Sequence, residues 1–229
     1  MIMINAFEII QLAIILAVSI GLHEYAHAYT SYRLWDPTPK LQNRLTPNPL
    51  RHIDPIWFLM IFLIHFWRGK PVQINPMYYK KPRQWELIVA LAGPATNIVL
   101  AIVGTIIVLI YSRIYWIEII NSLDAISNLI SNWTTINEIF INFRWLFIAI
   151  NLWLAVFNMI PIPPLDWFRL IKMFRQKAWD FIEKYTLYIS IFFLILIIWP
   201  GSNIIWWFIW YIVSHIFNFM ALIFWQIFY

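Results

Sequence analysis

Residues 7–31 read FEIIQLAIILAVSIGLHEYAHAYTS, and this stretch decides the fold. A helix of this length is about 37 Å long, enough to cross the roughly 30 Å hydrocarbon core of a bilayer. It contains His23, Glu24 and His27 as an H-E-x-x-H motif. Ionisable groups are costly in hydrocarbon and usually mark a functional centre. The stretch therefore predicts a membrane-spanning helix that carries such a centre.

The spacing of the motif suits a metal ion. Residues four apart share one face of a helix, so the imidazoles of His23 and His27 can reach one ion, with Glu24 one position away. In zinc hydrolases such a pair binds the metal and the glutamate deprotonates water. The alternative is that the histidines only pack between helices, which this combination of residues disfavours. Catalytic zinc normally takes three protein ligands, so a third must lie elsewhere in the chain.

The composition is that of a membrane protein. Hydrophobic residues make up 62% of the 229 residues and charged residues 12%, against roughly 45–50% and 25% in soluble domains. Cysteine is absent, so only His, Asp or Glu can hold a metal ion. The net charge of +5 comes without a long basic run or a basic helix face. We attribute it to membrane topology and expect no nucleic-acid partner.

The pattern of apolar stretches predicts an all-α polytopic membrane protein, with a single membrane-embedded domain over residues 1–229. We divide it into a core, 7–178, and a C-terminal helical pair, 182–228. The hydrophobic stretch 53–67 would be only roughly 22 Å long as a helix, so we expect it to be re-entrant or interfacial. About five transmembrane helices are expected, over residues 7–31, 86–111, 140–162, 182–200 and 204–228.

The charges of the loops predict the orientation. Basic residues outnumber acidic ones in 33–54, 68–83 and 166–184, whereas acidic residues outnumber basic ones in 112–139. The positive-inside rule places the first three segments at the cytoplasmic face. The N-terminus, which lacks the features of a cleaved signal peptide, then lies outside. The histidine pair lies toward the cytoplasmic end of the first helix.

Asp166 is the expected third ligand, because it lies on the same side of the membrane as the histidine pair. It follows Pro161, Pro163 and Pro164, which break the helix. A membrane tolerates the freed backbone groups only where protein or a water-filled cavity satisfies them. The alternative is that Asp166 caps the basic amphipathic stretch that follows it.

Two other polar positions have open roles. Asn97 closes the segment Gly93-Pro94-Ala-Thr-Asn97, which we expect to interrupt the 86–111 helix. It either hydrogen-bonds to another helix or presents donors to a substrate, while the small residues beside it are equally explained by close helix packing. His52 precedes the short hydrophobic stretch and is either a polar group at its rim or part of a second layer around the metal.

Five motifs carry a family resemblance: His23-Glu24-Tyr-Ala-His27, Asn48-Pro49 to Asp54-Pro55, Gly69-Lys70-Pro71-Val72 with Asn75-Pro76, Ala92-Gly93-Pro94 with Asn97, and Asn158 to Asp166. In this order they resemble the site-2 protease family of intramembrane zinc metalloproteases, over about residues 15–175. The resemblance is closest to its short bacterial-type members without a PDZ domain.

The resemblance implies one Zn²⁺ ion bound by His23, His27 and Asp166, with Glu24 as general base. It places Asn97 and Asn158 among polar helix residues near the site. It also implies an integral protein of a bacterial cell membrane, with its site toward the cytoplasm. The partners would be the lipid bilayer and single-span membrane proteins, whose transmembrane segments this family cleaves.

Tryptophan stands where the family pattern has glycine. The chain has 15 Trp and 5 Gly, whereas average usage would give roughly 16 Gly. Glycine supplies positive φ or close backbone approach, which tryptophan does poorly. We hypothesise that the gene comes from a source that decodes UGA as glycine, whereas this sequence was translated with UGA as tryptophan. UGG codons at these positions would rule this out; interfacial aromatic residues are the alternative. The positions are Trp35, Trp57, Trp67, Trp85 and Trp167.

Two rival functions follow from the same residues. A catalytically inactive membrane scaffold could retain the motifs, and a literal Trp167 beside Asp166 favours this rival. A metal transporter could use the same ligands, but transporters often contain inverted repeats and paired broken helices. The sequence has no internal repeat, so we rank the transporter last.

Overall fold

A computed structural model describes residues 6–54, 71–115, 136–169, 171, 176–198 and 203–228. These residues form helices and connecting loops, with no strand among them, so the all-α prediction is confirmed. Five helices are long: α1 (Ala6–Arg33), α4 (Pro82–Tyr115), α6 (Ile136–Asn158), α8 (Gln176–Ile198) and α9 (Asn203–Phe228). The short helices are α2 (Thr38–Leu41), η1 (Pro49–Arg51), η2 (Pro76–Tyr78) and η3 (Asp166–Phe168).

The long helices fall close to the predicted apolar stretches, although their ends differ by up to six residues, as at α8, which begins at Gln176 rather than at 182. Two differences concern prolines. Helix α6 ends at Asn158 rather than at residue 162, because Pro161 restricts the residue before it and lacks a backbone donor. The expected interruption at Gly93-Pro94 is wrong, since α4 runs through Pro94 as one helix. A proline removes a single hydrogen bond of the helix, which neighbouring helices and side chains can compensate in a membrane.

Three helical segments among the described residues are long and apolar enough to cross a membrane: Ile9–Arg33, Pro82–Tyr111 and Trp206–Ile223. The apolar part of α6, Phe143–Asn158, is shorter. Most of the 53–67 stretch, with Trp57 and Trp67, lies outside the described residues. The count of five crossings therefore stays a prediction.

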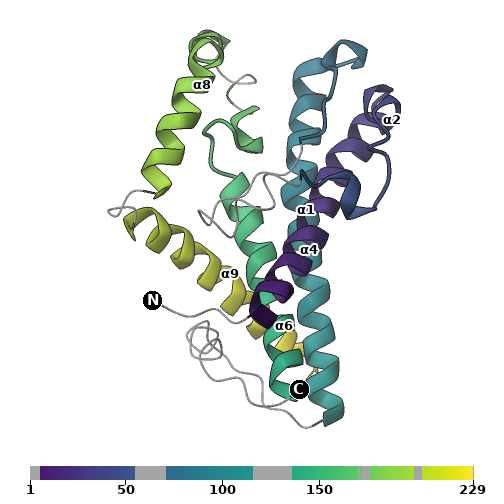
Figure 1. The fold of residues 1–229 in the computed structure, drawn as a ribbon, viewed down its shortest axis with the longest axis vertical. Helices are drawn as coiled ribbons and strands as arrows, with labels where there is room; N and C mark the ends of the chain where they lie inside the picture. The colour runs from purple at the N-terminus through teal and green to yellow at the C-terminus, as the bar shows by residue number, and fades with distance from the viewer. Residues whose placement is uncertain are drawn as a thin grey trace.

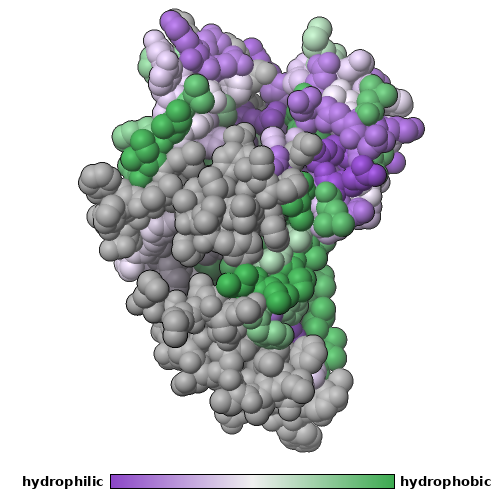
Figure 2. Space-filling model, viewed as in Figure 1, coloured by the Kyte–Doolittle hydropathy of each residue, from purple (hydrophilic) through white to green (hydrophobic). Residues whose placement is uncertain are grey.

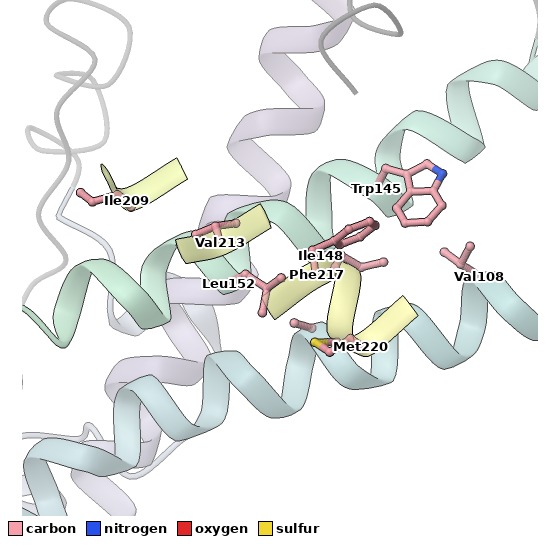
Figure 3. Close-up of a cluster of buried hydrophobic side chains, with 9 residues drawn as sticks. Val108, Trp145, Ile148, Leu152, Ile209, Val213, Phe217 and Met220 are labelled. Atoms are coloured by element: carbon pink, nitrogen blue, oxygen red, sulfur yellow. The ribbon is translucent and has the colours of Figure 1, made fainter. Parts of the chain in front are cut away.

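Helix α4 lies along both α1 and α6, and α9 packs across α6 and α4 (Figure 1). A buried apolar cluster joins α4, α6 and α9 (Figure 3). Helix α6 places Trp145 against Phe217 of α9, with ring centroids 5.2 Å apart. In a membrane such close packing, rather than escape from water, holds helices together. The cluster is Ala101, Val108, Trp145, Ile148, Leu152, Ile209, Val213, Phe217 and Met220.

The surface divides into a polar end and apolar helix flanks. Hydrophilic residues gather at the end of the molecule that carries α2, and hydrophobic residues lie farther along the helices (Figure 2). Large apolar side chains are exposed on the outer faces of α1 and α4, as lipid contact requires; they include Ile10, Ile14, Val99, Val103, Ile107 and Ile110.

Trp35 has a backbone conformation that suits glycine. It follows α1 with φ of 74°, in the left-handed region, and its side chain is 68% exposed. Apart from glycine, this region is favoured only by residues such as Asn, and Asn43, with φ of 55°, is the other described example. The geometry supports the hypothesis that glycine is encoded at position 35. Trp85 and Trp167 lie in helical segments, where φ makes no such demand.

Candidate metal centre

The structure brings His23, His27 and Asp166 together. Helix α1 places the two histidines one turn apart on one face, and their Nε2 atoms are 3.1 Å from each other. Asp166, at the start of η3, places Oδ2 2.9 Å from Nε2 of His23 and Oδ1 3.3 Å from Nε2 of His27. Leu165 rather than Asp166 precedes η3 as its N-cap residue. Trp167 does not keep Asp166 from the imidazoles.

These distances fit a zinc ion. Tetrahedral zinc with ligand bonds of about 2.0–2.1 Å separates its donor atoms by about 3.3 Å. The three donor pairs here are 2.9, 3.1 and 3.3 Å apart. Two imidazoles and one carboxylate, with no thiolate, are also a common catalytic zinc ligand set. The residues present therefore fit one zinc ion with a fourth position open.

The far sides of both imidazoles are fixed by hydrogen bonds. His27 donates from Nδ1 to the carbonyl oxygen of Val89 on α4, at 2.7 Å, so Nε2 is the ring nitrogen left for a metal ion. Nδ1 of His23 lies 2.5 Å from Oδ1 of Asn97, also on α4. Partners of this kind orient metal-binding histidines and select their tautomers. Asn97 thus contacts a candidate ligand, as the predicted hydrogen bond across helices requires.

Gly93 leaves the space that the imidazoles occupy. A Cβ added at Gly93 would lie 2.5 Å from Cε1 of His23 and 2.5 Å from Nε2 of His27. Real Cβ atoms essentially never approach other atoms so closely. Gly21 plays a comparable part on α1, where an added Cβ would lie 2.7 Å from Cα of Pro49 in η1. Glycine at these positions allows α4 and the η1 loop to approach α1.

The candidate base, Glu24, contacts the main chain of a second segment. The backbone N–H of Val72 donates to Oε2 of Glu24 at 3.1 Å. Residues 71–75 form neither helix nor strand and lead into η2. A main-chain donor therefore orients one oxygen of the carboxylate.

Asp36 anchors that same segment to α1. Its carboxylate is completely buried and accepts hydrogen bonds from Ser31 at 2.7 Å, from the N–H of Asn75 at 2.8 Å and from the N–H of Thr38 at 2.9 Å. Ser31 lies one turn after His27 and also contacts the Tyr79 hydroxyl at 2.5 Å. Burial raises the pKa of Tyr79 to about 12. The hydrogen bonds of Asp36 therefore fix residues 71–75, the segment that contacts Glu24.

The site opens on the side of Asp166. The Asp166 side chain is 23% exposed, whereas those of His23 and His27 are 7% and 9% exposed. Burial alone would raise the pKa of Asp166, but the adjacent imidazoles outweigh it and hold that pKa well below its usual range. An anionic carboxylate is the form that binds a metal ion.

His52 and Asn158 have other partners. His52 is completely buried and donates from Nε2 to the carbonyl oxygen of Thr46 at 2.8 Å, while its Nδ1 has no hydrogen-bond partner among the described residues. Burial lowers its pKa. His52 is therefore not a polar group at a solvent-exposed rim. Asn158 donates to the carbonyl oxygen of Leu154 within α6.

Three residues escaped the sequence analysis. Asn151 is completely buried on α6 and hydrogen-bonds to Asn97, but a lone asparagine in an apolar helix gives no spacing signal. In the sequence, Asp36 is one of several loop charges in 33–54, and nothing in its pattern indicates a buried role. Gly93 was noticed, but only as one of several small residues that allow helix packing.

Comparisons with known proteins agree with this geometry. The family model described as "Peptidase family M50" matches residues 11–197. The "Putative zinc metalloprotease YwhC" of Bacillus subtilis (strain 168) is 34% identical over 206 residues, covering 85% of this chain and 84% of the relative. No solved structure matches the chain.

Shorter matches point the same way. The "Putative zinc metalloprotease Rip2" of Mycolicibacterium smegmatis is 32% identical over 105 residues, 43% of this chain and 38% of the relative. The "Putative zinc metalloprotease MJ0611" of Methanocaldococcus jannaschii is 37% identical over 87 residues, 37% of this chain and 32% of the relative. Since the family match covers most of the chain, the protein belongs to peptidase family M50, the site-2 protease family.

Proposed function

We propose that this protein is an intramembrane zinc metalloprotease that hydrolyses peptide bonds in the transmembrane segments of other membrane proteins. One observation carries the proposal. His23 and His27 of a membrane-spanning helix meet Asp166, 139 residues farther on than His27, with donor atoms 2.9 to 3.3 Å apart. Glu24, beside His23, supplies a carboxylate that does not belong to this ligand set.

The proposed topology extends the three candidate spans to five crossings, with 53–67 re-entrant or interfacial and residues 1–229 forming one membrane domain. The N-terminus lies outside a bacterial cell membrane and the site faces the cytoplasm. The excess of basic residues in 33–54 and 68–83 supports this orientation. Figure 2 is consistent with it, since the hydrophilic surface lies at the end formed by the α1–α2 turn.

The chain's own groups divide the work of hydrolysis. His23, His27 and Asp166 would hold the ion, which when bound supplies Lewis acidity that acidifies water and polarises a carbonyl. Glu24 takes a proton from the attacking water while the water oxygen bonds to the carbonyl carbon. As the C–N bond breaks, Glu24 returns that proton to the leaving amine. Val72 holds one oxygen of Glu24, which leaves the other for the proton.

The proposed substrates are single-span membrane proteins. The carbonyls of a transmembrane helix are hydrogen-bonded within the helix, so a substrate has to unwind locally before attack. Water and the unwound segment would enter on the side of Asp166, which is the most exposed of the three proposed ligands.

Reconstitution with a single-span substrate tests the proposal. The protein should be made both as printed and with glycine at the five tryptophan positions, because Trp167 adjoins a proposed ligand. Glu24→Gln should abolish cleavage and keep one zinc ion per chain. Asp166→Asn should lower the zinc content. Cleavage by the Glu24→Gln variant would reject Glu24 as the base, and unchanged zinc in Asp166→Asn would remove Asp166 from the ligand set.

The inactive scaffold predicts a different result. It would bind partners without cleaving any reconstituted substrate, even with zinc bound and glycine at position 167. Membrane proteomics comparing cells with wild-type protein and cells with the Glu24→Gln variant extends the test to natural substrates. Accumulation of single-span proteins in the variant cells is the outcome expected of a protease.

A further inference from the structure

A chain of buried polar side chains connects α6 to the metal centre. Asn151 of α6 accepts a hydrogen bond through Oδ1 from Nδ2 of Asn97, at 2.9 Å, and Asn97 contacts Nδ1 of His23. Asn151 also donates from Nδ2 to Ser19 of α1 and to the carbonyl oxygen of Phe147, each at 2.9 Å. Ser19, Asn97 and Asn151 are all completely buried. The proposed reaction uses none of these groups directly.

The donor and acceptor roles along this series of hydrogen bonds are fixed at the end formed by Phe147. The main-chain carbonyl of Phe147 can only accept, so it selects the NH₂ group of Asn151 as its neighbour. The oxygen of Asn151 then faces Asn97 and accepts from its NH₂ group. This leaves the oxygen of Asn97 to face His23, and an amide oxygen can only accept. Nδ1 of His23 therefore carries a proton, and Nε2, which lies 2.9 Å from Oδ2 of Asp166, is the ring nitrogen left for a metal ion.

We propose that Asn151 is a positioning residue that fixes the ring orientation of His23 through Asn97, with Nδ1–H toward Asn97 and Nε2 toward Asp166. The inference rests on the proposed function in one respect, since it takes His23 to be a metal ligand. A metal ion binds a deprotonated ring nitrogen and displaces any proton there, so a ring held in this orientation offers Nε2 to the site. Without Asn151, the Asn97 amide is free to turn over and present its NH₂ group to His23.

A purely structural role makes different predictions. Helix-joining hydrogen bonds in membranes contribute to stability wherever they lie. If Asn151 only joined α6 to α4, its loss would lower stability without changing the affinity for zinc. Zinc affinity, measured beside stability, therefore separates the two roles.

The main variant is Asn151→Ser, because serine is too short to reach Asn97 and its hydroxyl can bond to its own helix. Asn151→Asp is the conservative variant, since a buried carboxyl group stays neutral and can both accept from Asn97 and donate to Phe147. Asn97→Ser and the double variant test whether both residues act through the same hydrogen bonds. Thr105→Ala is the matched control: Thr105 is buried on α4 and hydrogen-bonds to the carbonyl oxygen of Ala101 in the same helix.

Two readouts apply, neither of which needs the protease to turn over. Unfolding in detergent reports stability, and competition with a chelator reports zinc affinity. Asn151→Ser and Thr105→Ala should both lower stability, because each removes a buried hydrogen bond. Zinc affinity should fall about 10- to 100-fold in Asn151→Ser and remain near the wild-type value in Asn151→Asp and Thr105→Ala.

The double variant should bind zinc no more weakly than Asn97→Ser alone, because both changes break one chain. The inference is overturned if Asn151→Ser keeps the wild-type zinc affinity, or if the losses in the double variant simply add. Failure of the proposed function looks different: wild-type protein would cleave nothing, while its zinc affinity would still depend on Asn151.

Discussion

Gly93 of α4 lies so close to His27 of α1 that a Cβ on Gly93 would be 2.5 Å from the imidazole Nε2. The same Cβ would lie 2.5 Å from Cε1 of His23. The absence of a side chain at one position on α4 is therefore what gives both candidate ligands their room.

Gly93→Ala should abolish zinc binding. The added methyl group cannot be accommodated without turning one or both imidazoles away from Asp166, so zinc affinity should fall by at least roughly 100-fold. Elemental analysis of purified protein measures the zinc content. Gly104→Ala is the control on the same helix, where the added Cβ meets Ile148 at 3.0 Å and Phe147 at 3.2 Å. It should cost about 1–3 kcal/mol of stability from overpacking and keep its zinc; wild-type zinc affinity in Gly93→Ala would contradict the geometry.

Trp35→Gly should make the protein more stable. A non-glycine residue in the left-handed region costs roughly 1–2 kcal/mol, and the lost contact between the Trp35 ring and Lys80, 5.6 Å away, offsets part of the gain. We expect the free energy of unfolding in detergent to rise by about 1 kcal/mol. Asn43→Gly should change it little, because Asn tolerates this region. A Trp35→Gly variant no more stable than the parent would remove the structural support for glycine at this position.

Asp36→Asn should loosen residues 71–75. The carboxylate accepts three hydrogen bonds through its two oxygens, and an amide has one oxygen with which to accept. At least one buried donor loses its partner, at a cost of about 1–3 kcal/mol. Limited proteolysis should then cut near Val72 faster than in the wild type, with zinc content unchanged. Unchanged cleavage near Val72 would show that Asp36 does not hold this segment.

His52 should make stability depend on pH. Burial lowers the pKa of His52 below its ordinary value of 6.5, so the folded protein binds fewer protons at this site than the unfolded chain. Its contribution is complete above pH 6.5 and is lost as the pH falls through the lower pKa of the folded state. The loss can reach about 1.4 kcal/mol per pH unit. Unfolding measurements from pH 7 to pH 5 should show a shallower slope for His52→Gln; equal slopes would exclude a neutral, buried His52.

The sequence predicts those features that depend on composition or on residues close together in the chain. Long apolar runs predicted the five long helices, with ends that differ by up to six residues. Loop charges predict that Asp166 lies on the same side of the membrane as His23 and His27, and in the structure the three side chains meet. The H-E-x-x-H spacing is local, because two residues one helical turn apart always share a face. Each of these signals is visible in neighbouring residues or in composition.

The features that escaped prediction depend on single contacts between distant segments. Asn151 meets Asn97 across 54 positions of the chain, and Val72 meets Glu24 across 48. A main-chain donor such as that of Val72 leaves no trace in residue identity. The helix through Pro94 was mistaken for a break because proline weakens isolated helices, whereas packing against α1 and α6 supports this one.

The series of buried hydrogen bonds from Phe147 through Asn151 and Asn97 to His23 also restricts the motion of the helices. It locks α1, α4 and α6 in rotation, because turning any one of them would strand amide groups in surroundings without water. We therefore expect these three helices to keep a fixed orientation relative to one another. If the protein cleaves transmembrane segments as proposed, a substrate has to be admitted by movement of other described helices, such as α8, rather than by rotation of these three.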